Sequence, residues 1–212
     1  MEGYESEKEQ VEAIKKWWKA NGKSIIVGAV LGVVLVLGGR WWLANQDKQA
    51  ELASEQYDEV VQEIKKGDNE AALERGGHLL EVFANSTYAA LTALELAKLK
   101  VDQADLEGAR YFLQWVVDHS SEAQFKDVAR LRLGRVLAAK GDNAGALQVV
   151  NAVDVKTFAF PAQELKGDIL LAQGDREGAR AAYSAAADAI PQGGDQSRIE
   201  MKLAEVGGKG AP

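Results

Sequence analysis

The sequence predicts an all-α protein in which one N-terminal transmembrane helix precedes a soluble domain of repeated helices, an α-solenoid. Three observations predict this fold. Residues 24–39 form an uncharged apolar run, the rest of the chain carries apolar residues every three or four positions, and a five-residue motif recurs three times. Convincing period-two runs, which would indicate β-strands, are lacking. The 212 residues have room for an anchor and one domain of ordinary size.

The distribution of charge separates the anchor region from the rest of the chain. The net charge is −7, but residues 1–40 carry six basic and five acidic residues, whereas residues 41–212 carry 19 basic and 27 acidic residues. An acidic domain lacks the basic surface that neutralises phosphates, so we expect no nucleic-acid partner. Cysteine is absent, which excludes disulfides and thiolate chemistry.

The apolar run predicts a membrane span with aromatic and basic ends. As a helix, residues 24–39 extend over roughly 24 Å, slightly less than the hydrocarbon core of about 30 Å. Tryptophan pairs on both sides supply the remainder, because indole rings favour the two headgroup regions, and flanking cations can reach outward to the same regions. We therefore predict a transmembrane helix over residues 24–43, anchored by Trp17, Trp18, Lys23, Arg40, Trp41 and Trp42.

The basic residues also predict an orientation. Four lysines lie in residues 15–23, whereas Arg40 and Lys48 follow the run, and positive residues near a span stay on the cytoplasmic side. We expect residues 1–23 in the cytosol and the lipid bilayer as a partner of the span. A cleaved signal peptide is the alternative, but the leading segment is long, contains five Glu and is followed by bulky Trp41 rather than small residues.

Gly28 and Gly32 form a G-x-x-x-G pair within the run. Such a pair can let a second membrane helix approach closely. Glycine is also common in membrane helices for no such reason. The sequence leaves both interpretations open.

A repeat organises the soluble part of the chain. The motif Asp-x-x-Gly-Ala occupies residues 105–109, 142–146 and 175–179, and a degenerate copy occupies 67–72. The last two full copies are 33 residues apart, and the spacing resembles the tetratricopeptide repeat, a helix-turn-helix unit of about 34 residues. We therefore predict a tetratricopeptide-like domain over residues 44–206, a capping helix over 197–206 and a flexible tail over 207–212. The aligned positions on paired helices are Ala97, Gly134 and Gly167, opposite Leu113, Val150 and Tyr183.

Nearly the whole chain resembles the YfgM family. The likeness is carried by Tyr4-Glu5, the stretches 10–15 and 21–23, and Arg40. It continues through Tyr88, the stretches 94–97, 131–133 and 174–180, and Met201-Lys202. The resemblance implies a single-pass protein of the inner membrane of Gram-negative bacteria, with a cytoplasmic N-terminus and a tetratricopeptide-like domain in the periplasm.

The resemblance also implies partners and a role. Members of that family are ancillary subunits of the Sec translocon and associate with PpiD, a membrane-anchored periplasmic chaperone of the peptidyl-prolyl isomerase type. We therefore expect a scaffold that links translocated polypeptides to periplasmic chaperones, with a connection to envelope stress. The alternative is a regulator that sequesters an envelope-stress response factor by protein-protein interaction.

No pattern in the sequence indicates catalysis. The two histidines, His78 and His119, are not in a metal-ligand spacing, and no phosphate-binding loop or nucleophile elbow is present. The Gly-Asp turns are explained by helix termination and capping. We expect no catalytic residue, no metal, no cofactor and no enzymatic activity.

A repeat domain binds partners on the face lined by the first helix of each repeat. The repeat register places six residues on that face as a candidate partner groove: Leu94, Lys98, Leu131, Arg135, Glu164 and Asp168. Leucines edged by charges would suit an extended or helical polypeptide. The alternative is that the leucines belong to the core and the charges are only solvated, and the sequence leaves both open.

Overall fold

The computed structural model describes residues 2–191 and 193–207, and these residues contain nine α-helices. The chain divides into two compact units, Met1–Glu51 and Leu52–Pro212. The predicted all-α architecture is confirmed for the described part of the chain. The predicted tail lies almost wholly outside it, since residues 208–212 are not described and Gly207 is the last residue of a helix.

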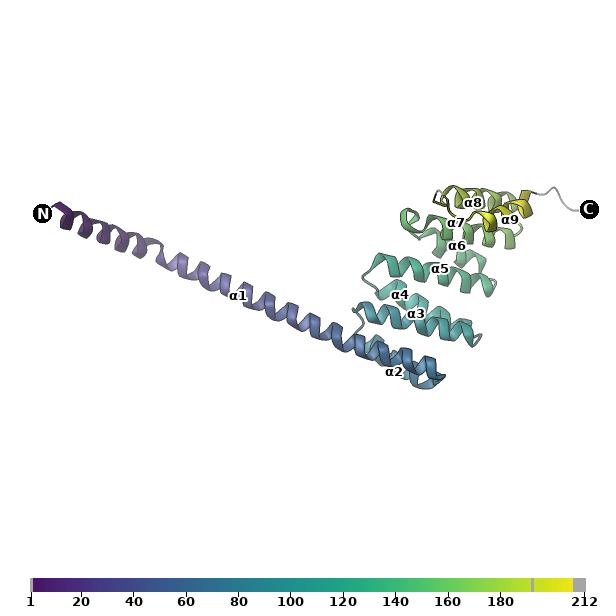
Figure 1. Ribbon diagram of the computed structural model, residues 1–212, viewed down its shortest axis with the longest axis horizontal. Helices are drawn as coiled ribbons and strands as arrows, with labels where there is room; N and C mark the ends of the chain where they lie inside the picture. The colour runs from purple at the N-terminus through teal and green to yellow at the C-terminus, as the bar shows by residue number, and fades with distance from the viewer. Residues whose placement is uncertain (1, 192, 208–212) are drawn as a thin grey trace, which may run out of the picture. The chain divides into compact units, whose positions relative to one another are not determined.

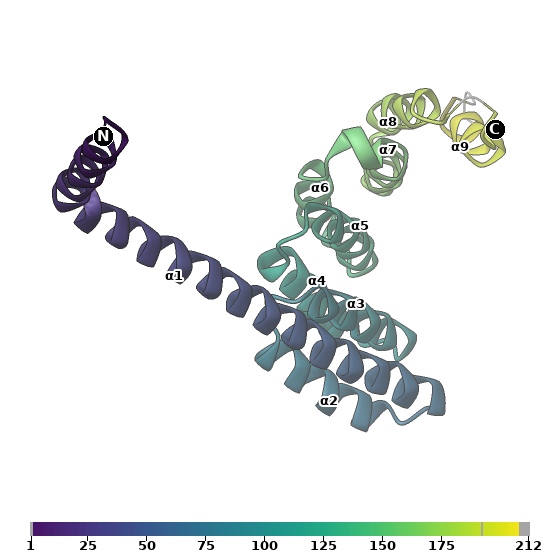
Figure 2. The ribbon, with the colours of Figure 1, turned by 60° about the vertical axis from the view of Figure 1, so that its left-hand side comes forward.

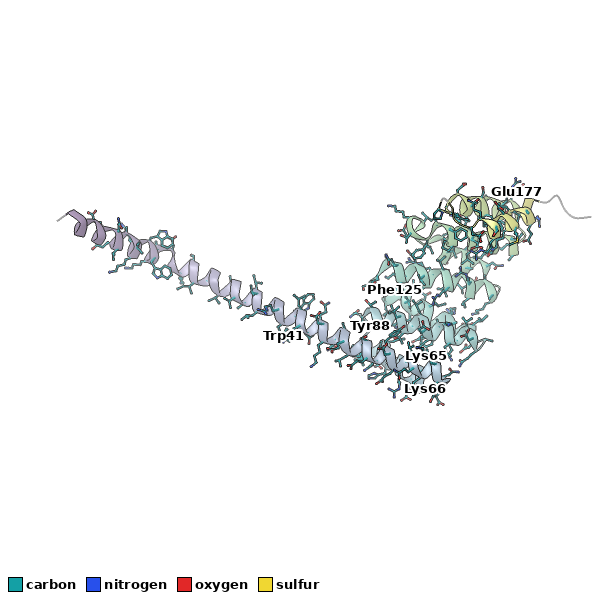
Figure 3. All side chains as sticks on the ribbon, in the orientation of Figure 1. Trp41, Lys65, Lys66, Tyr88, Phe125 and Glu177 are labelled. Carbon is teal, nitrogen blue, oxygen red and sulfur yellow. The ribbon has the colours of Figure 1, made fainter. Side chains whose placement is uncertain are left out.

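The first unit is the N-terminal part of one long helix, α1 (Glu2–Lys66). This helix is long and apolar enough to cross a membrane, and only 6% of its most apolar segment is buried by the rest of the protein. The core helix of a soluble protein would be mostly buried instead. Figure 3 shows the indole of Trp41 projecting away from the helix axis, and 71% of this residue is exposed.

The second unit contains the end of α1 and eight further helices, which follow one another as hairpins (Figure 1). Figure 2 shows these hairpins stacked along a curve from α2 to α9. The helices are α2 (Asn69–Val82), α3 (Thr87–Asp102), α4 (Leu106–His119), α5 (Ala123–Ala139), α6 (Asn143–Asn151), α7 (Val155–Ala172), α8 (Arg176–Asp188) and α9 (Ser197–Gly207). The compact unit begins at Leu52, inside a helix that continues without a break from the apolar segment.

The recurring motif marks the start of the second helix in each hairpin. The Asp175 carboxylate accepts a hydrogen bond from the Gly178 backbone N–H at 2.8 Å and caps α8. Asp105 and Asp142 cap α4 and α6 in the same way, at 2.9 Å. Such caps satisfy backbone N–H groups that have no partner inside the helix. The degenerate copy is also a cap, because Asp68 accepts from the Ala71 N–H at 3.1 Å.

Small residues let the two helices of a hairpin pack closely. A Cβ atom at Gly134 would lie 2.6 Å from Val150 Cγ2, which joins α5 to α6. The alanine that closes each motif is fully buried, as Ala109, Ala146 and Ala179 all show. In the repeat, a small residue on the first helix thus aligns with a larger residue on the second helix because the two residues are in direct contact, as Gly134 and Val150 are.

Aromatic residues pack between helices of neighbouring hairpins and against the main core. The rings of Tyr57 and Tyr88 lie 5.9 Å apart and join the end of α1 to α3. Phe125 packs against the main core from the first turn of α5, and Figure 3 shows Tyr88 and Phe125 at the same edge of the stack. Within α7, Phe158 departs from helical geometry (φ −121°, ψ 30°) shortly before Pro161, so the helix is kinked there.

Candidate partner-binding surface

A groove of about 400 Å³ lies between α3 and α5, with α4 at its base. It separates the first helices of two successive hairpins. Nine residues line the groove: Ala97, Lys98, Val101, Leu106, Leu113, Arg132, Arg135, Val136 and Ala139.

The floor of the groove is apolar and its rim is basic. Ala97 and Leu113 are almost completely buried in the floor, while Val101 is 44% exposed. The three charged lining residues are all cations, Lys98, Arg132 and Arg135, and all three are exposed. Within residues 2–191 and 193–207, none of these cations forms an ion pair.

The six residues of the predicted partner groove have three different surroundings: two line the groove, two are buried in the core, and two contact α9. Lys98 and Arg135 line the groove described above. Leu94 and Leu131 are only 6% and 5% exposed and belong to the main core, as in the alternative that the sequence left open. Binding of a partner at these six positions stays a prediction.

Glu164 and Asp168, the last two residues of the predicted groove, are engaged by the C-terminal helix. Glu164 is a buried carboxylate on α7; it accepts a hydrogen bond from Arg198 at 2.8 Å and forms an ion pair with Lys202 at 3.2 Å. Lys202 also donates to Asp168 at 2.5 Å. Helix α9 therefore pairs its basic residues with the acidic residues of α7. Its Ile199 is buried in an apolar cluster with Ala179, Tyr183 and Ala186 of α8.

Tyr183 supports this acidic pair from the second helix of the hairpin. Its hydroxyl donates to the Asp168 carboxylate at 2.8 Å, and the Lys202 ammonium lies 5.5 Å from the ring centroid. Burial, followed by the hydrogen bond to the Asp168 carboxylate, raises the pKa of Tyr183 well above its ordinary value. The tyrosine therefore stays a neutral donor at physiological pH.

Arg132 is a lining residue that the sequence analysis did not single out. It lies three positions before Arg135 on α5, so both side chains reach the same helix face. The run Leu131-Arg132-Leu133-Gly134-Arg135 carries this spacing, but the repeat register alone does not show which cations meet at an opening.

A second hollow, of about 610 Å³, lies between the end of α1 and α2. One ion pair and one contact between polar side chains join the two helices across it. Arg75 donates to Glu59, and His78 Nδ1 lies 3.3 Å from Gln56 Oε1. His119, the other histidine, stacks on Trp115 with ring centroids 4.6 Å apart. Besides the paired residues, two further acidic residues line this hollow, Glu55 and Glu74, so it differs in charge from the groove between α3 and α5.

The predicted anchor residues lie on one uninterrupted helix. Trp18 and Trp41 are 23 positions apart, which corresponds to about 35 Å along α1 and matches a hydrocarbon core with its interfaces. Trp17 and Trp42 are 55% and 58% exposed. Gly28 and Gly32 are exposed, and a Cβ atom at either would meet nothing within 4 Å. Their packing against a second helix stays a prediction, as do the anchoring roles of Lys23 and Arg40.

The hairpin stack and its long apolar helix define a tetratricopeptide repeat-like protein with one helix able to cross a membrane. Residues 15–208 match the family model of the tetratricopeptide repeat-like domain. The chain is 34% identical to the ancillary SecYEG translocon subunit of Escherichia coli over 96% of its own length and 98% of the relative. It is 30% identical to the protein of the same name from Haemophilus influenzae, over 93% and 96% of the two chains. The chain belongs to this family, which confirms the resemblance to the YfgM family.

Proposed function

We propose that this protein is a non-catalytic, membrane-anchored subunit of the Sec translocon that links translocated polypeptides to a periplasmic chaperone. In this proposal α1 crosses the inner membrane with its N-terminus in the cytosol. The repeat domain then lies in the periplasm and presents the groove between α3 and α5 to a partner. The chaperone is of the membrane-anchored peptidyl-prolyl isomerase type, such as PpiD.

One observation carries the association with the translocon. The relatives named ancillary SecYEG translocon subunit align with this chain from the apolar helix through the repeat domain, over more than nine-tenths of both chains. The alignment therefore covers both parts that such a role requires, the apolar helix and the repeat domain. A repeat stack suits a scaffold because it presents an extended surface without a catalytic centre.

The absence of cysteine permits a direct test of the orientation. Single cysteines would be introduced at Ser121, which is exposed between α4 and α5, and at Gln10, which precedes the apolar run. A membrane-impermeant maleimide added to intact spheroplasts is expected to label Ser121→Cys alone. Labelling of Gln10→Cys alone would reverse the proposed orientation.

The partners are tested by photo-crosslinking in native membranes. A photoreactive amino acid would replace Lys98 or Arg135 in the groove, or Phe160 near the kink of α7. The same amino acid at Arg180, an exposed position on α8, is the matched control. We expect the groove positions to yield adducts with Sec components, the chaperone or translocating chains. Adducts from Arg180 alone, or purification without any Sec component after mild detergent extraction, would contradict the proposal.

A further inference from the structure

We propose that the groove between α3 and α5 binds an acidic, amphipathic segment of a partner polypeptide. A carboxylate of that segment would bridge Lys98 on α3 to Arg132 or Arg135 on α5, and an apolar side chain beside it would cover the floor. This inference rests on the proposed function, because it names the chemistry of the segment that the scaffold recognises.

The first evidence comes from equivalent positions in successive hairpins. The repeat offsets of 37 and 33 residues make Lys98, Arg135 and Asp168 equivalent. In the last hairpin, the space beside Asp168 is closed by α9, whose Lys202 carries the opposite charge. The protein thus closes one such space with a helix of complementary charge.

The groove between α3 and α5 carries cations, whereas the space beside Asp168 carries the acidic residues of α7. Lys98 faces it from α3, whereas Arg132 and Arg135 face it from α5, so cations line both sides. Like charges cannot pair across the gap, and they repel one another. An anion between them would be attracted from both sides. Three cations at one opening, without an ion pair among the described residues, also stand out because residues 41–212 carry only 19 basic residues against 27 acidic ones.

The floor of the groove determines what kind of anion fits. Val101, Leu106 and Val136 present aliphatic surface beneath the cations. A small inorganic anion would leave this surface in water, whereas an apolar side chain would bury it and gain hydrophobic stabilisation. The combination of apolar floor and basic rim therefore favours a polypeptide segment that alternates carboxylates with large apolar residues.

The test uses full-length protein in nanodiscs of uncharged lipid and two fluorescein-labelled peptides of equal length and equal leucine content. One peptide carries glutamates and the other carries lysines at the same positions. The variant Lys98→Glu/Arg132→Glu/Arg135→Glu reverses the rim. The control Lys65→Glu/Lys156→Glu/Arg180→Glu makes the same change of net charge at three exposed positions away from the groove.

We expect the wild-type protein to prefer the glutamate peptide, and the groove variant to bind it about tenfold more weakly at low salt. The control should stay within about twofold of the wild-type affinity, since none of its three residues lines the groove. Equal binding of the two peptides, or unchanged affinity in the groove variant, would overturn the inference.

A milder variant decides the question if the triple reversal does not fold. Val101→Asp places a carboxylate at a half-exposed position of the floor without removing a cation, and it should also weaken binding of the glutamate peptide. Undiminished binding in this variant counts against the inference. Recovery of Sec components from membranes is measured separately, so a wild-type protein that binds the peptide but recovers no translocon would refute the proposed function alone.

Discussion

Gly167 on α7 faces the ring of Tyr183 on α8 so closely that a Cβ atom at position 167 would lie 2.3 Å from Tyr183 Cε1. The tyrosine is only 1% exposed and is held by its hydrogen bond to Asp168, so the ring cannot move away freely. Tyr183 therefore connects the packing of α7 on α8 with Asp168, which together with Glu164 binds the basic residues of α9.

Gly167→Ala is therefore expected to destabilise the domain by about 1–3 kcal/mol, because the methyl group overpacks a filled site. Gly77→Ala is the matched control. Position 77 lies inside α2 with no atom near its missing Cβ, so alanine should stabilise that helix by about 0.5–1 kcal/mol. Urea denaturation of both variants measures the two effects, and equal midpoints would contradict the packing account.

The turn before α4 contains Ala104 in the left-handed region, at φ 59°. The equivalent turn residues are Gly141 (φ 82°) and Gly174 (φ 83°), which adopt this conformation without strain. Ala104→Gly should raise the free energy of unfolding by about 0.5–1 kcal/mol, and Gly141→Ala should lower it by about 1 kcal/mol. Thermal denaturation followed by circular dichroism checks both, and a loss of stability in Ala104→Gly would show that the strain is absent.

The cap of α4 makes stability depend on pH in the acid range. The Gly108 backbone N–H, followed by the Lys100 ammonium, holds the pKa of Asp105 below its ordinary value. In the unfolded chain the carboxyl of Asp105 has an ordinary pKa of about 3.9. The stabilisation by the cap is therefore complete above that pH and is lost as the pH falls through the lower pKa of the folded protein.

Asp105→Asn keeps a capping side chain but removes the titration. The midpoint temperature of the variant should therefore fall less than that of the wild type between pH 5 and pH 3. Differential scanning calorimetry across this range measures the difference. Parallel curves for the two proteins would show that Asp105 does not contribute to acid sensitivity.

Helix α9 should depend on its basic residues. In Arg198→Ala/Lys202→Ala, Glu164 loses both ion-pair partners while remaining largely buried, so we expect a loss of about 1–3 kcal/mol and faster hydrogen exchange in α9. Met201→Ala, at a position that is 67% exposed on the same helix, should leave exchange unchanged. Similar exchange in both variants would mean that burial of Ile199 and Val206 alone holds the helix.

The helices, the apolar span and the repeat were predictable because their signals are local. Each N-cap of the motif involves only an aspartate and the backbone N–H groups of the next turn. An amphipathic helix is recognised from its own 3.6-residue period. The small positions Gly134 and Gly167 could also be matched to Val150 and Tyr183, since the two helices of a hairpin are adjacent in the chain. The sequence does not predict that α1 continues from the apolar run to Lys66, because the membrane span and the repeats are recognised by different patterns and neither pattern shows that one helix runs through both.

The sequence by itself thus determined the helical class, the apolar helix with its flanking tryptophans and the 33-residue repeat, all from neighbours along the chain. Only the tertiary structure decided that Leu94 and Leu131 are buried, that α9 engages Glu164 and Asp168, and that Arg132 joins Lys98 and Arg135 at one opening. The physical reason is that burial and charge pairing depend on how far apart successive hairpins lie. The contacts of α9 with α7, for example, join residues 34 positions apart, and no local pattern records them.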